Sequence, residues 1–188
     1  MRKFLLVLMA LCLAAVPALA EPAALDFGDF TMTVPAGMQY DMADEIADGE
    51  LFFVLFQMDD TEDAYLSNLT VSWQENPMDV AGMDPAAFAQ STMDDLVDNM
   101  ERQSIAVANP AVLSAAMDEI GGRAALSIVY SIDVDFTGIG QDQQVTLTLT
   151  QRFVAEEGMG TYAFTLTTDD AENCQPLVDA LNSVVWAE

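Results

Sequence analysis

Residues 123–135 read RAALSIVYSIDVD, and their alternation indicates a β-strand with one buried face. The large apolar side chains fall at every second position: Leu126, Ile128, Tyr130, Ile132 and Val134. The dipeptide Gly121-Gly122 precedes this strand, and residues 106–120 can form the strand on the other side of that turn. We therefore expect a hairpin over residues 106–135.

Two segments further along the chain continue the alternating pattern. Residues 144–154 carry Thr146, Thr148 and Thr150 on one side and apolar side chains on the other. Residues 160–167 follow after a turn at residues 156–159. The spacing predicts a second hairpin beside the first.

Strands are also expected in the N-terminal third of the chain. Residues 26–35, in which Phe30, Met32 and Val34 alternate with Thr31 and Thr33, and residues 68–75 (NLTVSWQE) both alternate apolar and polar side chains. Residues 51–58 (LFFVLFQM) are almost continuously apolar, which is typical of a central strand covered on both faces.

Two helices complete the expected elements. Asp84 is a helix-capping residue and Pro85 suits the first helical position, so a helix is predicted from Pro85 to about Gln103. A last helix is predicted from about Glu172 or Pro176, with an inward apolar stripe of Leu177, Val178, Leu181, Val184 and Val185. Strands joined by short turns outnumber helices, which indicates an α+β fold with a mainly antiparallel sheet packed against helices.

The order of these elements resembles the PsbP-like fold. The features that carry the resemblance are FTMTVPAGM at 30–38, SNLTVSW at 67–73, PAAFAQSTMDDLVDNM at 85–100, AALSIVYSI at 124–132, QRFVAEEGMGTYAFTLTT at 151–168 and LNSVVW at 181–186. This family includes a photosystem extrinsic protein and small exported bacterial proteins such as the DcrB-like group. The resemblance implies an α/β/α sandwich and a non-enzymatic accessory or binding domain of the cell envelope, and it transfers no site residues.

Residues 1–20 are interpreted as a secretory signal peptide. Arg2 and Lys3 form a basic start, an apolar run extends from Phe4 to Val16, and small residues precede a cleavage site after Ala20. A retained membrane anchor would need about 20 apolar residues, and this run is shorter. The expected product is a single domain of residues 21–188 located outside the cytoplasm, either periplasmic or secreted.

The chain is strongly acidic. Its 188 residues carry 31 Asp and Glu, 5 Lys and Arg and no His, for a formal net charge of −26, and loss of Arg2 and Lys3 would take that value to −28. Nucleic acids and anionic membranes bind clustered Lys and Arg, so both are excluded as partners. A protein partner in the envelope or the extracellular space is expected instead.

Residue content also limits the available chemistry. Beyond residue 20 the sequence has no lysine, no histidine and one cysteine, Cys174, so it offers no internal disulfide, no catalytic triad and no histidine metal site. Cys174 is expected to be a small packed side chain. A hydrolase that uses two carboxyl groups needs none of the missing residues, and it stays open as an alternative.

Calcium is the one cation that the sequence favours, because it binds oxygen ligands. Asp133, Asp135, Thr137 and Asp142 follow the start of a calcium-binding loop, with Gly138 at its sixth position. The twelfth position holds Gln144 in place of the usual Glu, and a strand leads into the loop. A second acidic segment at residues 59–63 is more typical of a solvated loop.

The sequence therefore predicts an exported, non-catalytic accessory or binding domain without a resident cofactor. The first alternative is a calcium-dependent binding module that uses residues 133–142. The second alternative is a carboxylate-based hydrolase.

Overall fold

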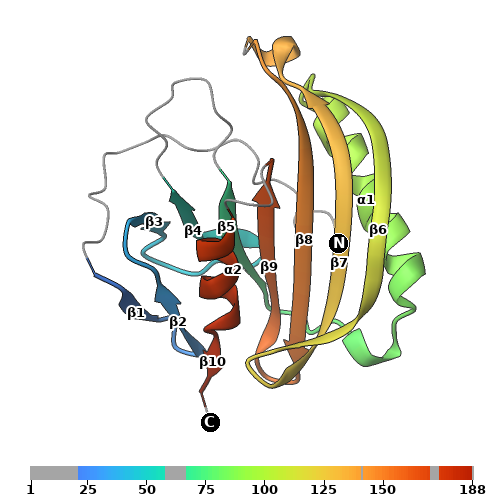
Figure 1. Ribbon diagram of the computed structural model, residues 1–188. Helices are drawn as coiled ribbons and strands as arrows, with labels where there is room; N and C mark the ends of the chain where they lie inside the picture. Colours follow the sequence, from blue (N-terminus) through green and yellow to red (C-terminus); the bar gives the residue numbers. More distant parts are fainter. Residues whose placement is uncertain (1–20, 58–66, 141, 170–173, 188) are drawn as a thin grey trace.

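A computed structural model of the chain describes residues 21–57, 67–140, 142–169 and 174–187. Its two β-sheets and two α-helices are arranged in layers (Figure 1). The expected signal peptide and the acidic segment at residues 59–63 lie outside the described residues. Within the described part, no helix has the length and apolar character needed to cross a membrane.

The larger sheet has seven strands, and every neighbouring pair is antiparallel. In spatial order the strands are β3 (Met38–Met42), β4 (Glu50–Gln57), β5 (Asn68–Gln74), β9 (Gly160–Thr168), β8 (Gln144–Glu156), β7 (Arg123–Asp135) and β6 (Ala106–Ile120). Both predicted hairpins, β6–β7 and β8–β9, are confirmed. Strand β4 was expected at the centre of the sheet but lies one position from its edge. Its run of apolar residues is explained by burial on both faces, with Phe53 and Leu55 on one face and Phe56 on the other.

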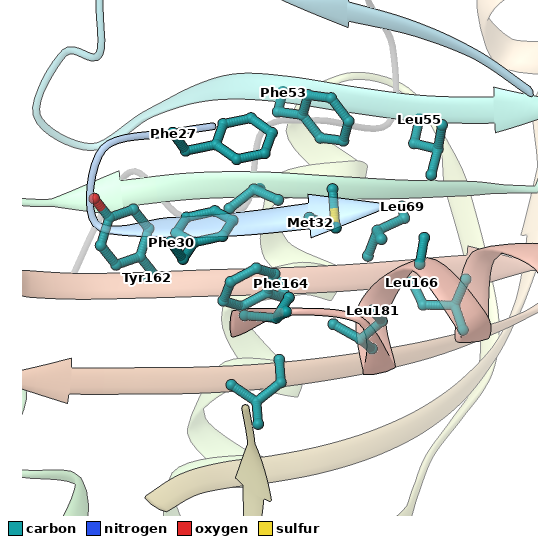
Figure 2. Packing of buried hydrophobic residues seen from close by; sticks show 14 of the residues in the cluster. Phe27, Phe30, Met32, Phe53, Leu55, Leu69, Tyr162, Phe164, Leu166 and Leu181 are labelled. Carbon is teal, nitrogen blue, oxygen red and sulfur yellow. The ribbon is translucent and has the colours of Figure 1, made fainter. Parts of the chain in front are cut away.

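A smaller three-stranded sheet packs on one face of this sheet together with the second helix, α2 (Gln175–Asn182). Its strands are β1 (Ala23–Asp26), β2 (Phe30–Val34) and β10 (Val185–Trp186). Alternation in β2 directs Phe30, Met32 and Val34 into the core. Figure 2 shows Phe30 and Met32 among side chains of β4, β5 and β9, with Phe30 close to Tyr162 and Phe164.

The first helix, α1 (Pro85–Arg102), packs on the opposite face, over β6 and β7. The larger sheet therefore has a hydrophobic core on each face. Successive side chains of β9 point to opposite faces, so Tyr162 and Phe164 belong to the core under the small sheet and Ala163 belongs to the core under α1. Asp84 caps the helix by accepting hydrogen bonds from the backbone N–H groups of Ala86 and Ala87 at 3.0 and 3.4 Å. The predicted α+β class with helices on both faces is confirmed.

The predicted C-terminal helix is wrong at its end. Helix α2 stops at Asn182, and Val185, which was expected to face inward, lies on β10 and is 62% exposed. Trp186 pairs with Phe30 and is buried, so strand alternation turns Val185 toward solvent. Strands β1, β3 and β10 were not predicted.

The C-terminal strand also closes the turn of the β6–β7 hairpin. The Trp186 indole N–H donates to the carbonyl oxygen of Ile120 at 2.7 Å. Gly121 has a φ of +57°, and a Cβ atom at this position would collide with the carbonyl oxygen of Val184. The turn therefore requires glycine both for its backbone angle and for this close approach.

One part of the larger sheet has no described element packed on it. Figure 1 shows α2 and the small sheet on the near side of β4, β5 and β9, with α1 behind β6 and β7. The near side of β6–β8, opposite α1, carries short and polar side chains that remain partly exposed: Ser127, Val129, Ser131, Thr148 and Thr150. We call this surface the open face.

Candidate functional site

The predicted calcium ligands lie at the end of the β7–β8 hairpin, beside the open face. Asp133 is on β7, directly opposite Thr146 on β8. Its carboxylate accepts hydrogen bonds from the Thr146 hydroxyl at 2.6 Å and from the Asn109 side-chain amide at 2.7 Å. These two donors occupy different oxygens of the carboxylate. The pKa of Asp133 is therefore held below its usual value, first by Thr146 and then by Asn109.

Asp135 lies two residues further along the same face of β7. Its carboxylate accepts a hydrogen bond from the backbone N–H of Thr137 at 2.9 Å, and its other oxygen accepts one from the Gln144 side chain at 2.9 Å. The pKa of Asp135 is lowered as well. The main cause is hydrogen bonding from the side chain and backbone of Thr137, and the Gln144 side chain adds to it. Both aspartates are consequently ionised at neutral pH.

An open concavity of about 480 Å³ contains both carboxylates. Its lining comes from the ends of three strands: Ala106, Val107, Ala108, Asp133, Val134, Asp135, Gln144, Val145 and Thr146. The short side chains of Ala106 and Ala108 on β6 leave room above the two aspartates. A concavity with two fixed negative charges and small neighbours can accept a positively charged group.

The four predicted ligands do not all share this concavity. Asp133 and Asp135 line it, but Thr137 and Asp142 do not. Thr137 begins a short 3₁₀ helix, η2 (Thr137–Ile139), and its backbone N–H is already bonded to Asp135. Across the described residues no three Asp, Glu or Cys side chains are grouped to hold a metal ion. Calcium binding by this loop stays an alternative to be tested.

The two aspartates of this concavity can also be compared with the carboxyl pair that the hydrolase alternative requires. Side chains two residues apart on a strand are separated by about 7 Å, which lies within the range for paired catalytic carboxyl groups. Such a pair needs one carboxyl group with a raised pKa, which donates a proton to the leaving group. The pKa is lowered for both Asp133 and Asp135, so neither fits the role of general acid.

Sequence reasoning missed the two donors that fix Asp133. Asn109 comes from a bulge in β6, where Asn109 and Pro110 lie between the paired residues Ala108 and Ala111. Its φ of +50° and the following proline mark an irregular position. An Asn-Pro pair inside an otherwise regular strand is the signal that could have suggested this bulge.

Strand β6 forms the second notable surface, because it is an edge of the seven-stranded sheet. Its inner side pairs with β7, and no described strand pairs with its outer side. Residues 103–117 contain no charged side chain, although the chain has 31 acidic residues. Leu113 and Met117 on this strand are 59% and 46% exposed. Edge strands usually carry charges that prevent pairing with other chains, so this neutral edge is unusual.

Charged groups appear only at the far end of β6. Asp118 forms an ion pair with Arg152 of β8, with 3.3 Å between the carboxylate and the guanidinium group. The adjacent Glu119 is exposed and has no ion-pair partner within the described chain. Cys174, by contrast, is buried at the start of α2, as expected for a packed side chain.

Comparisons with known proteins bear on the fold. No protein-family model matches this chain, and no curated protein matches its sequence. The structure is similar to the solution structure of cyanobacterial PsbP (CyanoP) from Synechocystis sp. PCC 6803, with a TM-score of 0.59 and 14% identity over 95% of this chain and 99% of that chain. It is also similar to the Saccharomyces cerevisiae Ran-binding protein Mog1p, with a TM-score of 0.51 and 12% identity over 88% and 95% of the two chains. These likenesses confirm the PsbP-like fold.

Proposed function

We propose that this chain is an exported, non-catalytic accessory domain that works by binding a protein partner outside the cytoplasm. The pattern of residues 1–20 supports export, and the PsbP-like fold supports a binding role. A second protein with this fold, Mog1p, is described as Ran-binding, so the fold is compatible with recognition of a protein. Fold alone does not determine function, and the surface of this chain has to carry the argument.

The observation that carries the proposal is the exposed side of β6–β8. The open face and the outer edge of β6 adjoin each other, and neither is covered by a described element. Leu113 and Met117 are large exposed apolar side chains on that edge. An exposed sheet face that ends at an uncovered edge with exposed apolar side chains is suited to contact with another protein.

Electrostatics restricts the partner. A formal net charge of −26 repels acidic proteins and accelerates encounter with basic ones. The ionised Asp133 and Asp135 place part of this charge next to the open face. The partner is therefore expected to present a neutral or basic surface.

Two measurements test export and binding separately. Cells that produce the full-length protein are fractionated, and the N-terminal sequence of the exported product is determined; we expect it to begin at Glu21. Photoreactive amino acids are then introduced one at a time at Ser131 and Thr148 on the open face and at Asp94 on α1. Specific cross-linked proteins are expected from the first two positions and not from Asp94. Retention in the cytoplasm, or no cross-link at any position, would contradict the proposal.

A further inference from the structure

We propose that the outer edge of β6 accepts one extended strand from the partner protein, and that this strand has an apolar centre and carries lysine or arginine beside it. The inference deepens the proposed function and rests on it. It identifies the surface and the chemistry of the segment that would be bound. The argument depends on the register of β6, on its two exposed apolar side chains and on the position of Glu119.

The register of β6 limits where a strand can be added. Bulges interrupt the pairing with β7 between Ala108 and Ala111 and again between Val112 and Ser114. From Ser114 to Ile120 the pairing is regular, with each residue opposite one residue of β7. Added strands need a regular row of backbone N–H and C=O groups, because these groups supply the binding energy. Seven residues span about 23 Å, which is enough for a short added strand.

The side chains of this segment define the chemistry of the occupant. Leu113 borders the regular segment and Met117 lies inside it, so both can contact apolar side chains of an added strand. Glu119 follows on the same face as Met117 and has no ion-pair partner within the described chain. A basic side chain two residues from the apolar position of the added strand would therefore lie near Glu119.

A second copy of this chain is a poorer occupant than a basic partner. Each copy carries a formal net charge of −26, and pairing two β6 edges would bring these like charges together. The Asn109-Pro110 bulge also removes a backbone donor and bends the strand, which hinders the pairing of two full-length edges. A short basic segment meets neither obstacle.

The test uses a defined peptide as the probe. The peptide alternates valine and threonine over seven residues and ends in two lysines. It is added to the ¹⁵N-labelled protein, expressed from its full sequence and purified after export, and binding is followed by amide chemical shifts. We expect shifts at residues 114–120 of β6. A peptide with alternate backbone nitrogens methylated cannot donate the same hydrogen bonds and is expected to give none.

Matched variants separate edge binding from general electrostatics. Met117→Lys introduces a charge on β6 and is expected to weaken binding at least fivefold. Met42→Lys makes the same change on β3, the opposite edge of the sheet, where Met42 is also 46% exposed, and is expected to change binding less than twofold. Glu119→Lys should weaken binding of the lysine peptide and strengthen binding of a peptide that carries glutamates instead. Unfolding midpoints near the unmodified value would show that all three variants fold.

Several outcomes would overturn the inference. One is that Met117→Lys and Met42→Lys weaken peptide binding to the same extent. Another is that the methylated peptide binds as tightly as the unmethylated one. A third is that millimolar peptide causes no amide shifts in β6. A dimer in sedimentation that Met117→Lys dissociates would assign the edge to a second copy instead. Each of these leaves the proposed function standing if the open face still cross-links to a protein in cells, so the two failures can be told apart.

Discussion

The Tyr162 hydroxyl donates a hydrogen bond to the Asp29 carboxylate, with 2.8 Å between the two oxygens. Tyr162 belongs to β9 of the larger sheet, and Asp29 lies in the turn that leads into β2 of the smaller sheet. The bond therefore joins the two sheets at the margin of their shared aromatic core. Burial raises the pKa of Tyr162, and the hydrogen bond and negative charge of Asp29 raise it further.

This raised pKa predicts a loss of stability at alkaline pH. An unfolded tyrosine has a pKa of about 10, so the folded state holds its proton more tightly. The stabilisation is fully present below pH ~10 and is lost as the pH rises through the folded pKa. In urea unfolding, Tyr162→Phe should cost about 1 kcal/mol at pH 7 and reduce the decline above pH ~10. Tyr40→Phe is the control, because the Tyr40 hydroxyl makes no hydrogen bond within the described chain. If stability of Tyr162→Phe declines above pH ~10 as steeply as that of the unmodified protein, Tyr162 has no such role. The decline would then be assigned to Tyr130, whose pKa is also raised by burial.

The cap of α1 gives a second prediction. Asp84→Ala removes the acceptor for two backbone N–H groups and should lower the unfolding free energy by about 1 kcal/mol. Asp98→Ala removes the same charge from an exposed ion pair with Arg102 on the same helix, and should change stability by less than about 0.5 kcal/mol. Both variants are compared by denaturant unfolding. Similar losses in both would mean that charge, and not capping, governs the effect.

The core that joins the two sheets gives a third prediction. Phe164 is fully buried and packs against Phe30 and Trp186 with ring centroids 5.4 and 6.1 Å apart. Phe164→Ala should cost about 3–5 kcal/mol, because it removes a large buried side chain and leaves a cavity. Leu113→Ala, at the exposed edge, should cost less than about 0.5 kcal/mol. A loss below about 1 kcal/mol for Phe164→Ala would mean that the small sheet packs differently.

The calcium prediction can be tested through stability. Hydrogen-bond donors already occupy both oxygens of Asp133 and of Asp135, so we expect CaCl₂ and NaCl of equal ionic strength to raise the melting midpoint alike. The rise in both salts comes from screening of the acidic surface. A specific calcium site predicts an additional rise in CaCl₂ that EDTA reverses and Asp133→Asn abolishes. Thermal melting monitored by circular dichroism distinguishes the two outcomes.

The long strands of the fold were predictable because their own residues determine their state. Residues 123–135 alternate over many positions, and residues 106–120 lie on the other side of the Gly121-Gly122 turn, so both strands of the hairpin have the predicted bounds. Strands β1 and β10 have only four and two residues, too few for alternation to be recognised. They are extended because each pairs with β2, which lies between them. This pairing is a tertiary contact, and it cannot be predicted from the residues of either short strand alone.

The candidate site was predictable in part for the same reason. Strand alternation alone places Asp133 and Asp135 on one face of β7. The donors to Asp133 depend on which residues of β6 and β8 lie opposite it, and the bulge at Asn109 and Pro110 shifts that register. The exposure of Leu113 and Met117 depends in turn on β6 being the last strand of the sheet, which follows from strand order and not from sequence period.

The pairing of β2 with β10 has a consequence for the order in which this chain acquires its structure. Phe30 and Trp186 are partners, so the small sheet joins segments more than 150 residues apart in sequence. Contacts of such high sequence separation form late, because a long loop must close first. A chain that lacks residues 185–186 cannot complete this sheet or the hydrogen bond from Trp186 to Ile120. The smaller sheet is therefore completed only after the most C-terminal strand is available, whereas the seven-stranded sheet contains no described strand beyond Thr168 and does not depend on it.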